Sequence, residues 1–138
     1  MVEKAIRIYD SQFAKSQIRE HLLRLPLTDR YMRFFSTLSK ESIDKYVNSI
    51  NLNSLTGEAG FGIFLNIDGP RLVGFCHVAQ TNDETEERCA EMAISVDADY
   101  RRRGFGRILF KRGLLHCESY NIKRVYMNCL ASNTIMKK

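Results

Sequence analysis

With 138 residues and a mass of 16.0 kDa, the chain has the length of one domain, large enough to bury a core without disulfide or metal support. Its hydrophobic content of 44% and charged content of 27% are ordinary globular values, and it contains no low-complexity tract, internal repeat or membrane-spanning apolar run. The net charge of +5 favours anionic ligands, of which nucleic acid is the usual one to consider.

The N-terminus and the cysteines indicate the compartment. The first residues lack the long apolar core of a signal peptide, so we expect a cytoplasmic protein with no membrane partner. The cysteines stand singly in apolar contexts, without a Cys-x-x-Cys pair, at Cys76, Cys89, Cys117 and Cys129. We therefore expect reduced core thiols and no metal site.

The first part of the chain predicts one strand followed by two helices. Lys4 to Tyr9 alternates loosely as a strand does, after which Asp10 or Ser11 can cap a helix. The apolar face of that helix ends before Pro26 and comprises Ala14, Ile18, Leu22 and Leu25. Ser39 can cap a second helix, whose buried stripe would be Ile43, Tyr46, Val47 and Ile50.

The middle of the chain predicts a β-hairpin and a further strand. Phe61 to Ile67 and Leu72 to Ala79 are rich in β-forming residues and flank Asp68-Gly69, a strong hairpin signal. Arg88 to Val96 is the next predicted strand, and it leads into a turn crowded with arginine and glycine.

The last part of the chain predicts a helix and a fifth strand. The helix, from about Phe105 to Ser119, has a broad apolar face in which Gly113 would allow close approach to a sheet. It is followed by a strand at Lys123 to Leu130, and the order strand, helix, strand predicts a right-handed parallel unit. Because the hairpin is antiparallel, we expect a mixed sheet in one α+β (α/β) domain covering residues 1–138.

The turn after the fourth strand is the candidate anion site. Arg101, Arg102 and Arg103 precede two glycines, Gly104 and Gly106, at the start of the predicted helix. A helix start presents unpaired N–H groups and a positive dipole end, and glycine lets an anion approach the backbone. Outside this turn the positive charges are spread along the chain and form no basic stripe. The excess positive charge is therefore explained more simply by a phosphorylated cofactor than by nucleic acid. A tight turn with solvated arginines remains the alternative.

The spacing within this turn excludes two common phosphate motifs. A dinucleotide fingerprint would need glycine in place of Leu109, and a P-loop would need Gly-Lys-Ser/Thr in place of Gly106-Arg107-Ile108. The segment instead resembles the acetyl-CoA signature of the Gcn5-related N-acetyltransferase (GNAT) family, V-x-P-x-Y-R/Q-x-x-G-x-G/A. The matching residues are Val96, Tyr100, Arg101, Gly104 and Gly106, whereas Ala98 replaces the usual proline.

The resemblance implies a fold and an activity. It covers Lys4 to Lys138 and implies the GNAT fold, with N-terminal antiparallel strands and a parallel strand-helix-strand unit around acetyl-CoA; the family's last helix and closing strands are expected beyond Lys138. The implied reaction is direct transfer of acetyl from acetyl-CoA to a primary amine of a small molecule or protein. The alternative is a non-catalytic CoA-binding module. No nucleic acid or metal is expected as a partner. The apolar edge of the fifth strand predicts either association through that edge, such as a homodimer, or a longer polypeptide of which this chain is the ordered part.

The resemblance also implies site residues. Backbone groups of Ile94, Ser95 and Val96 would bond the pantetheine arm, and Asn133 would contact the cofactor from the last helix. The pyrophosphate would be held by Arg101, Arg102, Arg103, Gly104, Phe105, Gly106 and Arg107.

Glu91 is the candidate general base. It is a carboxylate inside an otherwise apolar strand, where desolvation would raise its pKa towards the useful range. A solvent-facing position on a two-faced strand is the equally supported alternative. His77 is a weaker candidate, expected as a packed strand residue.

Overall fold

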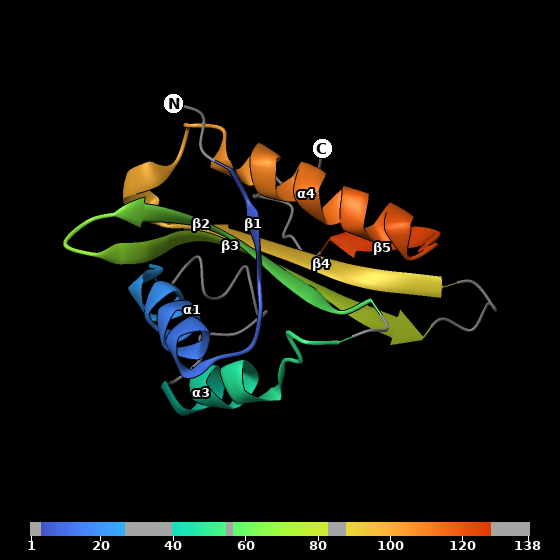
Figure 1. Cartoon of the computed structure of the whole chain (residues 1–138), viewed down its shortest axis with the longest axis horizontal. Helices are drawn as coiled ribbons and strands as arrows, with labels where there is room; N and C mark the ends of the chain where they lie inside the picture. The colour runs from blue at the N-terminus through green and yellow to red at the C-terminus, as the bar shows by residue number, and fades with distance from the viewer. Residues whose placement is uncertain (1–3, 27–39, 55–56, 83–87, 128–138) are drawn as a thin grey trace.

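A five-stranded mixed sheet forms the centre of the molecule, with strand order β1-β2-β3-β4-β5. The computed structural model describes residues 4–26, 40–54, 57–82 and 88–127. Figure 1 shows helix α4 on one side of the sheet and helices α1 and α3 on the other, so the described residues form three layers. This arrangement confirms the predicted α+β class.

The N-terminal elements follow the predicted order. Strand β1 covers Ile6–Ile8, shorter than predicted, and helix α1 covers Gln12–Arg24. Ser11 caps α1, because its Oγ accepts the Ala14 N–H at 2.9 Å. The predicted face of α1 is confirmed, since each of its four apolar residues is buried. Helix α3 covers Lys40–Ser49 and buries Ile43 and Val47, while its predicted cap, Ser39, lies outside the described residues.

Three antiparallel strands follow. Strand β2 covers Ala59–Asn66, β3 covers Pro70–Asn82 and β4 covers Arg88–Val96. The predicted hairpin turn is confirmed, with Asp68 at φ 53° and Gly69 at φ 101°. Strand β3 runs further than predicted, because its pairing with β4 continues as far as Asn82 opposite Arg88.

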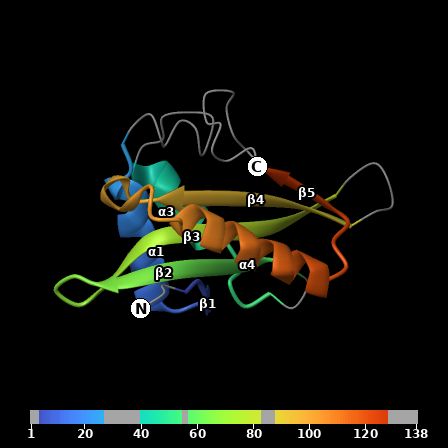
Figure 2. The same ribbon diagram turned by 90° about the horizontal axis from the view of Figure 1, so that it is seen from above.

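The crossover to the last described strand is parallel, as predicted. A short 3₁₀ turn, η1, covers Ala98–Tyr100, helix α4 covers Phe105–Ser119, and strand β5 covers Arg124–Met127 beside β4. Figure 2 shows α4 lying over the sheet, from the turn after β4 to the loop before β5. The close approach predicted for Gly113 is confirmed, because a Cβ there would lie 2.7 Å from Met92 Cε.

The two faces of the sheet carry separate apolar cores, one under α4 and one under α1 and α3. Cys76, Cys89 and Cys117 are buried in the core as predicted, and burial raises the pKa of the Cys117 thiol to about 11. Cys129 lies outside the described residues.

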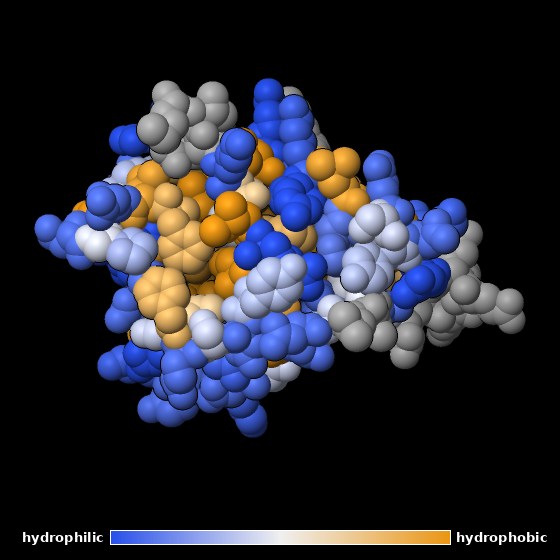
Figure 3. Space-filling view, in the orientation of Figure 1, coloured by the Kyte–Doolittle hydropathy of each residue, from blue (hydrophilic) through white to orange (hydrophobic). Residues whose placement is uncertain are grey.

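Figure 3 shows apolar surface bordered by hydrophilic side chains on the face seen in Figure 1. Across the described residues, the exposed large apolar side chains are Ile6, Tyr9, Phe13, Leu115 and Tyr126. No described helix is long and apolar enough to cross a membrane, and no described group of His, Cys, Asp or Glu could hold a metal ion.

Candidate functional site

The turn between β4 and α4 leaves open space beside its two glycines. Gly104 caps α4 with φ 83°, a conformation that side-chain-bearing residues adopt only with strain. Among the residues that the structure describes, none has a heavy atom packed within 4 Å of a Cβ built on Gly104 or on Gly106. The backbone at the start of α4 is therefore accessible to a ligand.

The start of α4 presents hydrogen-bond donors in a positive field. The first hydrogen bond after the cap runs from the Ile108 N–H to the Gly104 carbonyl at 3.1 Å, so the N–H groups of Phe105, Gly106 and Arg107 precede it. The first turn contains no acidic residue, and the arginines at positions 101–103 and 107 are exposed. Because the Phe105 ring is buried, that residue offers the turn only its main chain.

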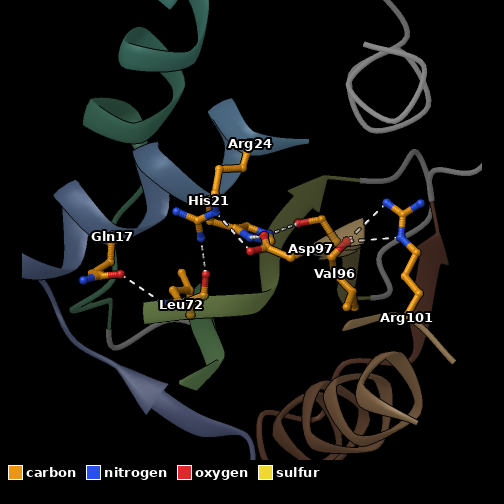
Figure 4. Close-up of polar contacts among 8 residues, drawn as sticks. Gln17, His21, Arg24, Leu72, Val96, Asp97 and Arg101 are labelled. Carbon is orange, nitrogen blue, oxygen red and sulfur yellow. Dashed lines mark hydrogen bonds and ion pairs between the residues drawn. The ribbon is translucent and has the colours of Figure 1, made fainter. Parts of the chain in front are cut away.

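Two arginines shape the turn itself. The Arg101 guanidinium donates to the Val96 carbonyl from Nε at 3.3 Å and Nη2 at 3.2 Å (Figure 4). The Arg103 guanidinium lies over the Tyr100 ring, 5.1 Å from its centroid. Both contacts lie within the turn, one of them joining Arg101 to the end of β4.

The outer edge of β4 presents backbone groups beside this turn. The Asp97 N–H donates to the Val73 carbonyl on β3 at 2.8 Å. Backbone bonding alternates along an antiparallel pair, so Ser95 also faces β3, whereas Ile94 and Val96 point to the opposite edge. In the described part of the chain, β5 pairs with β4 only as far as Met92. The Ile94 and Val96 N–H groups therefore point to the β5 side of β4, beyond the pairing described for residues 89–92.

The side chain of Ser95 belongs to a buried polar network that local sequence spacing did not reveal. His21 Nε2 lies 2.8 Å from Ser95 Oγ. His21 Nδ1 lies 2.6 Å from Asp97 Oδ1 (Figure 4). The Arg24 guanidinium donates from Nε to Asp97 Oδ2 at 3.0 Å and from Nη2 to the Leu72 carbonyl at 2.6 Å. The network joins α1 to the end of β4, directly before the glycine turn.

Electrostatics keep Asp97 ionised in this network. Burial by itself would raise the pKa of Asp97, but the hydrogen bond and charge of His21 and the charge of Arg24 lower it below its ordinary value. Asp97 is therefore a carboxylate, which can only accept, so His21 Nδ1 carries a hydrogen.

A second polar cluster surrounds His77 on the same face of the sheet. The Tyr46 hydroxyl lies 2.7 Å from His77 Nδ1, and Glu58 Oε2 lies 2.9 Å from His77 Nε2. Burial would raise the pKa of Glu58, yet the hydrogen bonds from His77 and the Asn51 N–H, with the His77 charge, lower it. Both ring nitrogens of His77 have protein partners, and its ring stacks on Phe75, as expected of a packed strand residue.

The structure places Glu91 on β4 but away from the glycine turn. Glu91 is partly exposed and lies opposite Ala79 on β3 and Tyr126 on β5. Glu91 lies four positions before Ser95 on the same side of the strand, which corresponds to ~13 Å. Asn133, the predicted cofactor contact from the last helix, lies outside the described residues.

The acetyltransferase (GNAT) family model matches residues 23–138, which include β4, the glycine turn and α4. The chain belongs to the GNAT family. This membership confirms the resemblance first noted from Val96 to Gly106, and it identifies the domain as an acetyltransferase of a family that uses acetyl-CoA. Among curated proteins, none matches this chain in sequence.

Solved structures share the GNAT fold at low sequence identity. The GNAT domain of S. lividans PAT superposes with a TM-score of 0.77 at 16% identity, covering 97% of this chain and 76% of that one. Glucosamine-6-phosphate N-acetyltransferase from Arabidopsis thaliana has a TM-score of 0.67 at 15% identity, covering 98% and 87%. An aminoglycoside N-acetyltransferase in complex with CoA has a TM-score of 0.66 at 13% identity, covering 98% and 83%. These similarities confirm the predicted fold.

Proposed function

We propose that this GNAT domain transfers the acetyl group of acetyl-CoA directly to a primary amine on a small molecule or a protein. The observation that carries the proposal is the open glycine turn, where a Cβ at either Gly104 or Gly106 would have no packing neighbour within 4 Å among the described residues. Exposed arginines border this space, and the start of α4 faces it with free donors. A pyrophosphate is the chemical group that fits such a turn.

The glycine turn and the outer edge of β4 would bind different parts of the cofactor. The N–H groups of 105–107, with Arg101, Arg102, Arg103 and Arg107, would bind the pyrophosphate. The outward N–H groups of Ile94 and Val96 would bond the pantetheine arm and face the thioester oxygen. The Ser95 main chain faces β3 and is turned away from the edge where the pantetheine arm would bind. We therefore propose that Ser95 contributes to the cofactor site through its side chain and not through its backbone. Asn133 remains a proposed contact of the cofactor.

Glu91 is the proposed general base for the acceptor ammonium. It lies on the β4 face that α1 and α3 flank, opposite the face that α4 covers, and its partial exposure gives a substrate access to it. Distance along the strand separates it from the Ile94 edge by ~10 Å, so one or more water molecules would carry the proton. We also propose that the protein is cytoplasmic and forms a homodimer.

Acetyl-CoA binding and acetyl transfer test the proposal separately. CoA should raise the melting temperature, because a ligand of the folded state stabilises it by mass action. Release of free CoA thiol should then depend on an added amine, measured over a panel of amines and peptides. A thermal shift without amine-dependent release supports the alternative, a CoA-binding module without turnover. The absence of any shift with CoA contradicts both.

A further inference from the structure

We propose that Arg7 and Arg112 form a second anion site, at the place where α4 passes over β2, and that it binds a small oxyanion with two negative charges. A phosphate monoester and a dicarboxylate both have this chemistry. The inference goes beyond the proposed function, because it uses no residue of the glycine turn or of the β4 edge.

The two arginines come from distant parts of the chain and meet at one buried ring. Arg7 on β1 pairs with Phe61 on β2, so their side chains project from the same face of the sheet, the one that α4 covers. The Arg7 guanidinium carbon lies 5.8 Å from the Phe61 ring centroid. The Arg112 guanidinium carbon lies 4.4 Å from the same centroid. Phe61 is fully buried, so both guanidinium groups border one fixed surface.

Neither guanidinium is neutralised by a carboxylate. In the part of the chain that the structure describes, no Asp or Glu forms an ion pair with Arg7 or Arg112. Arg24, by contrast, pairs with Asp97. Two positive charges held against one ring repel each other, and an anion bound between them would replace that repulsion with two attractions.

Most of the hydrogen-bond donors of Arg7 are unused. A guanidinium has five N–H donors, and the described residues give that of Arg7 one long hydrogen bond, from Nη2 to the Leu52 carbonyl at 3.5 Å. Its Nε is buried without a hydrogen-bond partner among them, which costs free energy. Arg7 and Arg112 are both partly exposed, so an oxyanion can reach their outer nitrogens and bind in the two-pronged manner that guanidinium favours.

The buried His116 lies within the field of both arginines. Its Nε2 donates to the Gly57 carbonyl at 2.7 Å, since a carbonyl can only accept. Burial lowers the pKa of His116, the Gly57 bond opposes this, and the charges of Arg7 and Arg112 lower the pKa further. The other titratable side chain packed on the imidazole is Tyr120, with 4.7 Å between ring centroids. An anion between the arginines should therefore raise the pKa of His116.

Histidine NMR of the full chain tests the site. The ring C–H signal of His116, identified by its loss in His116→Gln, is followed against pH in chloride and, at equal ionic strength, in phosphate or in succinate. We expect phosphate or succinate to raise the pKa of His116 saturably and by more than chloride does. His77, on the α3 side of the sheet, is the internal reference. A response to phosphate alone identifies a phosphorylated ligand, and a response to succinate identifies a dicarboxylate.

Glutamine variants locate the binding. Arg7→Gln and Arg112→Gln each remove one guanidinium and should raise the half-saturating anion concentration about tenfold or more. Lys111→Gln removes the same charge from an exposed position of α4 and should respond as wild type does. Thermal melting verifies that each variant is folded, and Arg112→Gln decides the question if Arg7→Gln does not fold.

Three outcomes would overturn the inference. These are a chloride effect on His116 as large as that of phosphate and succinate, a phosphate or succinate effect that does not saturate, and unchanged half-saturation in the glutamine variants. Arginines that only pack against Phe61 predict a lower melting temperature in both variants and no anion response in the wild type.

Gly106→Ala separates this site from the proposed cofactor turn. The change should leave the response of His116 to phosphate or succinate as in the wild type. Loss of CoA binding with an intact His116 response would affect the proposed function alone, and CoA binding without any His116 response would remove the second site alone.

Discussion

At the scale of single residues, glycine is favoured at the two positions of the turn for different physical reasons. Gly104 has a positive φ of 83°, whereas Gly106 is not among the positive-φ residues and lies within the first turn of α4. Conformation therefore requires glycine only at 104. At 106 the available reason is space, because a methyl group there would extend into the region proposed for phosphate.

Gly106→Ala should weaken CoA binding without weakening the fold. Alanine is the better helix former, by up to about 1 kcal/mol, so the free energy of unfolding should stay equal or rise. The dissociation constant for CoA should rise about tenfold or more, a change measurable by calorimetry and equal to about 1.4 kcal/mol.

A second pair of variants separates strain from space. Gly104→Ala and Gly69→Ala both place a side chain at positive φ in open space, at 83° and 101° respectively, and each should cost about 1–2 kcal/mol. Only the change at Gly104 should affect CoA. Unaltered CoA affinity in both Gly104→Ala and Gly106→Ala would contradict the phosphate turn.

Glu91→Gln tests the proposed base at the same scale. If Glu91 removes the proton of the acceptor, kcat should fall about 10²-fold while acetyl-CoA affinity stays constant, since the amide keeps the shape of the side chain. Steady-state kinetics and CoA titration measure the two quantities. Glu118→Gln, on the exposed face of α4, is the control. A parallel loss of CoA affinity would show that Glu91 instead stabilises the strand.

At the scale of elements, polar bonds as well as apolar packing hold α1 against the sheet. Gln17 Oε1 accepts the Leu72 N–H at 2.9 Å, and His21 and Arg24 reach the end of β4 from the next turns of the helix. Figure 4 shows these contacts following one another from the start of β3 to the glycine turn. The position of α1 is thereby coupled to the site.

The packing of α4 depends on Gly113. A Cβ there would lie 2.7 Å from Met92 Cε and 3.2 Å from Cys76 Sγ, so Gly113→Val should overpack the interface and cost about 1–3 kcal/mol. Chemical denaturation measures this cost, and Leu115→Val, on the exposed side of α4, is the control for placing a β-branched residue in this helix. Combining Gly113→Val with Met92→Ala should cost less than the sum of the single changes. Strict additivity would contradict the contact.

At the scale of the whole molecule, two carboxylates link stability to pH. The pKa values of Asp97 and Glu58 are lowered from ordinary values of 3.8 and 4.5, so the folded state holds fewer protons on them than the unfolded chain. Their stabilising contribution is complete above those ordinary values and is lost as the pH falls through the lower folded values. The free energy of unfolding should therefore decrease from about pH 5 downward.

Urea denaturation from pH 3 to pH 7 measures this dependence. Asp97→Asn should flatten the acid limb, because it removes one of the two linked groups. Asp99→Asn changes an exposed carboxylate in the same turn and should leave the limb as in the wild type. An acid limb of equal slope in Asp97→Asn and wild type would contradict the assignment.

The sequence predicted the features that local spacing encodes. Four apolar residues of α1, the Asp68-Gly69 turn, the bounds of β4 and α4, and the parallel β5 were each visible as a periodicity or a short motif. The Ser95–His21–Asp97 network was not visible, because His21 lies 74 and 76 positions from its two partners. No spacing rule joins a helical histidine to a strand so far along the chain. The same reason hid the Tyr46–His77–Glu58 cluster.

The alternation along β4 has a consequence for how the site can vary. Ile94 and Val96 send their backbone groups to the outer edge, while Ser95 and Asp97 send side chains to α1. Inserting one residue upstream in β4 would exchange the parity of all four positions, removing the edge donors and the His21 partners together. Inserting two would restore parity but shift both sets by ~7 Å. The edge donors of Ile94 and Val96 and the hydroxyl of Ser95 therefore keep a fixed position relative to each other, and neither can move along the strand without the other.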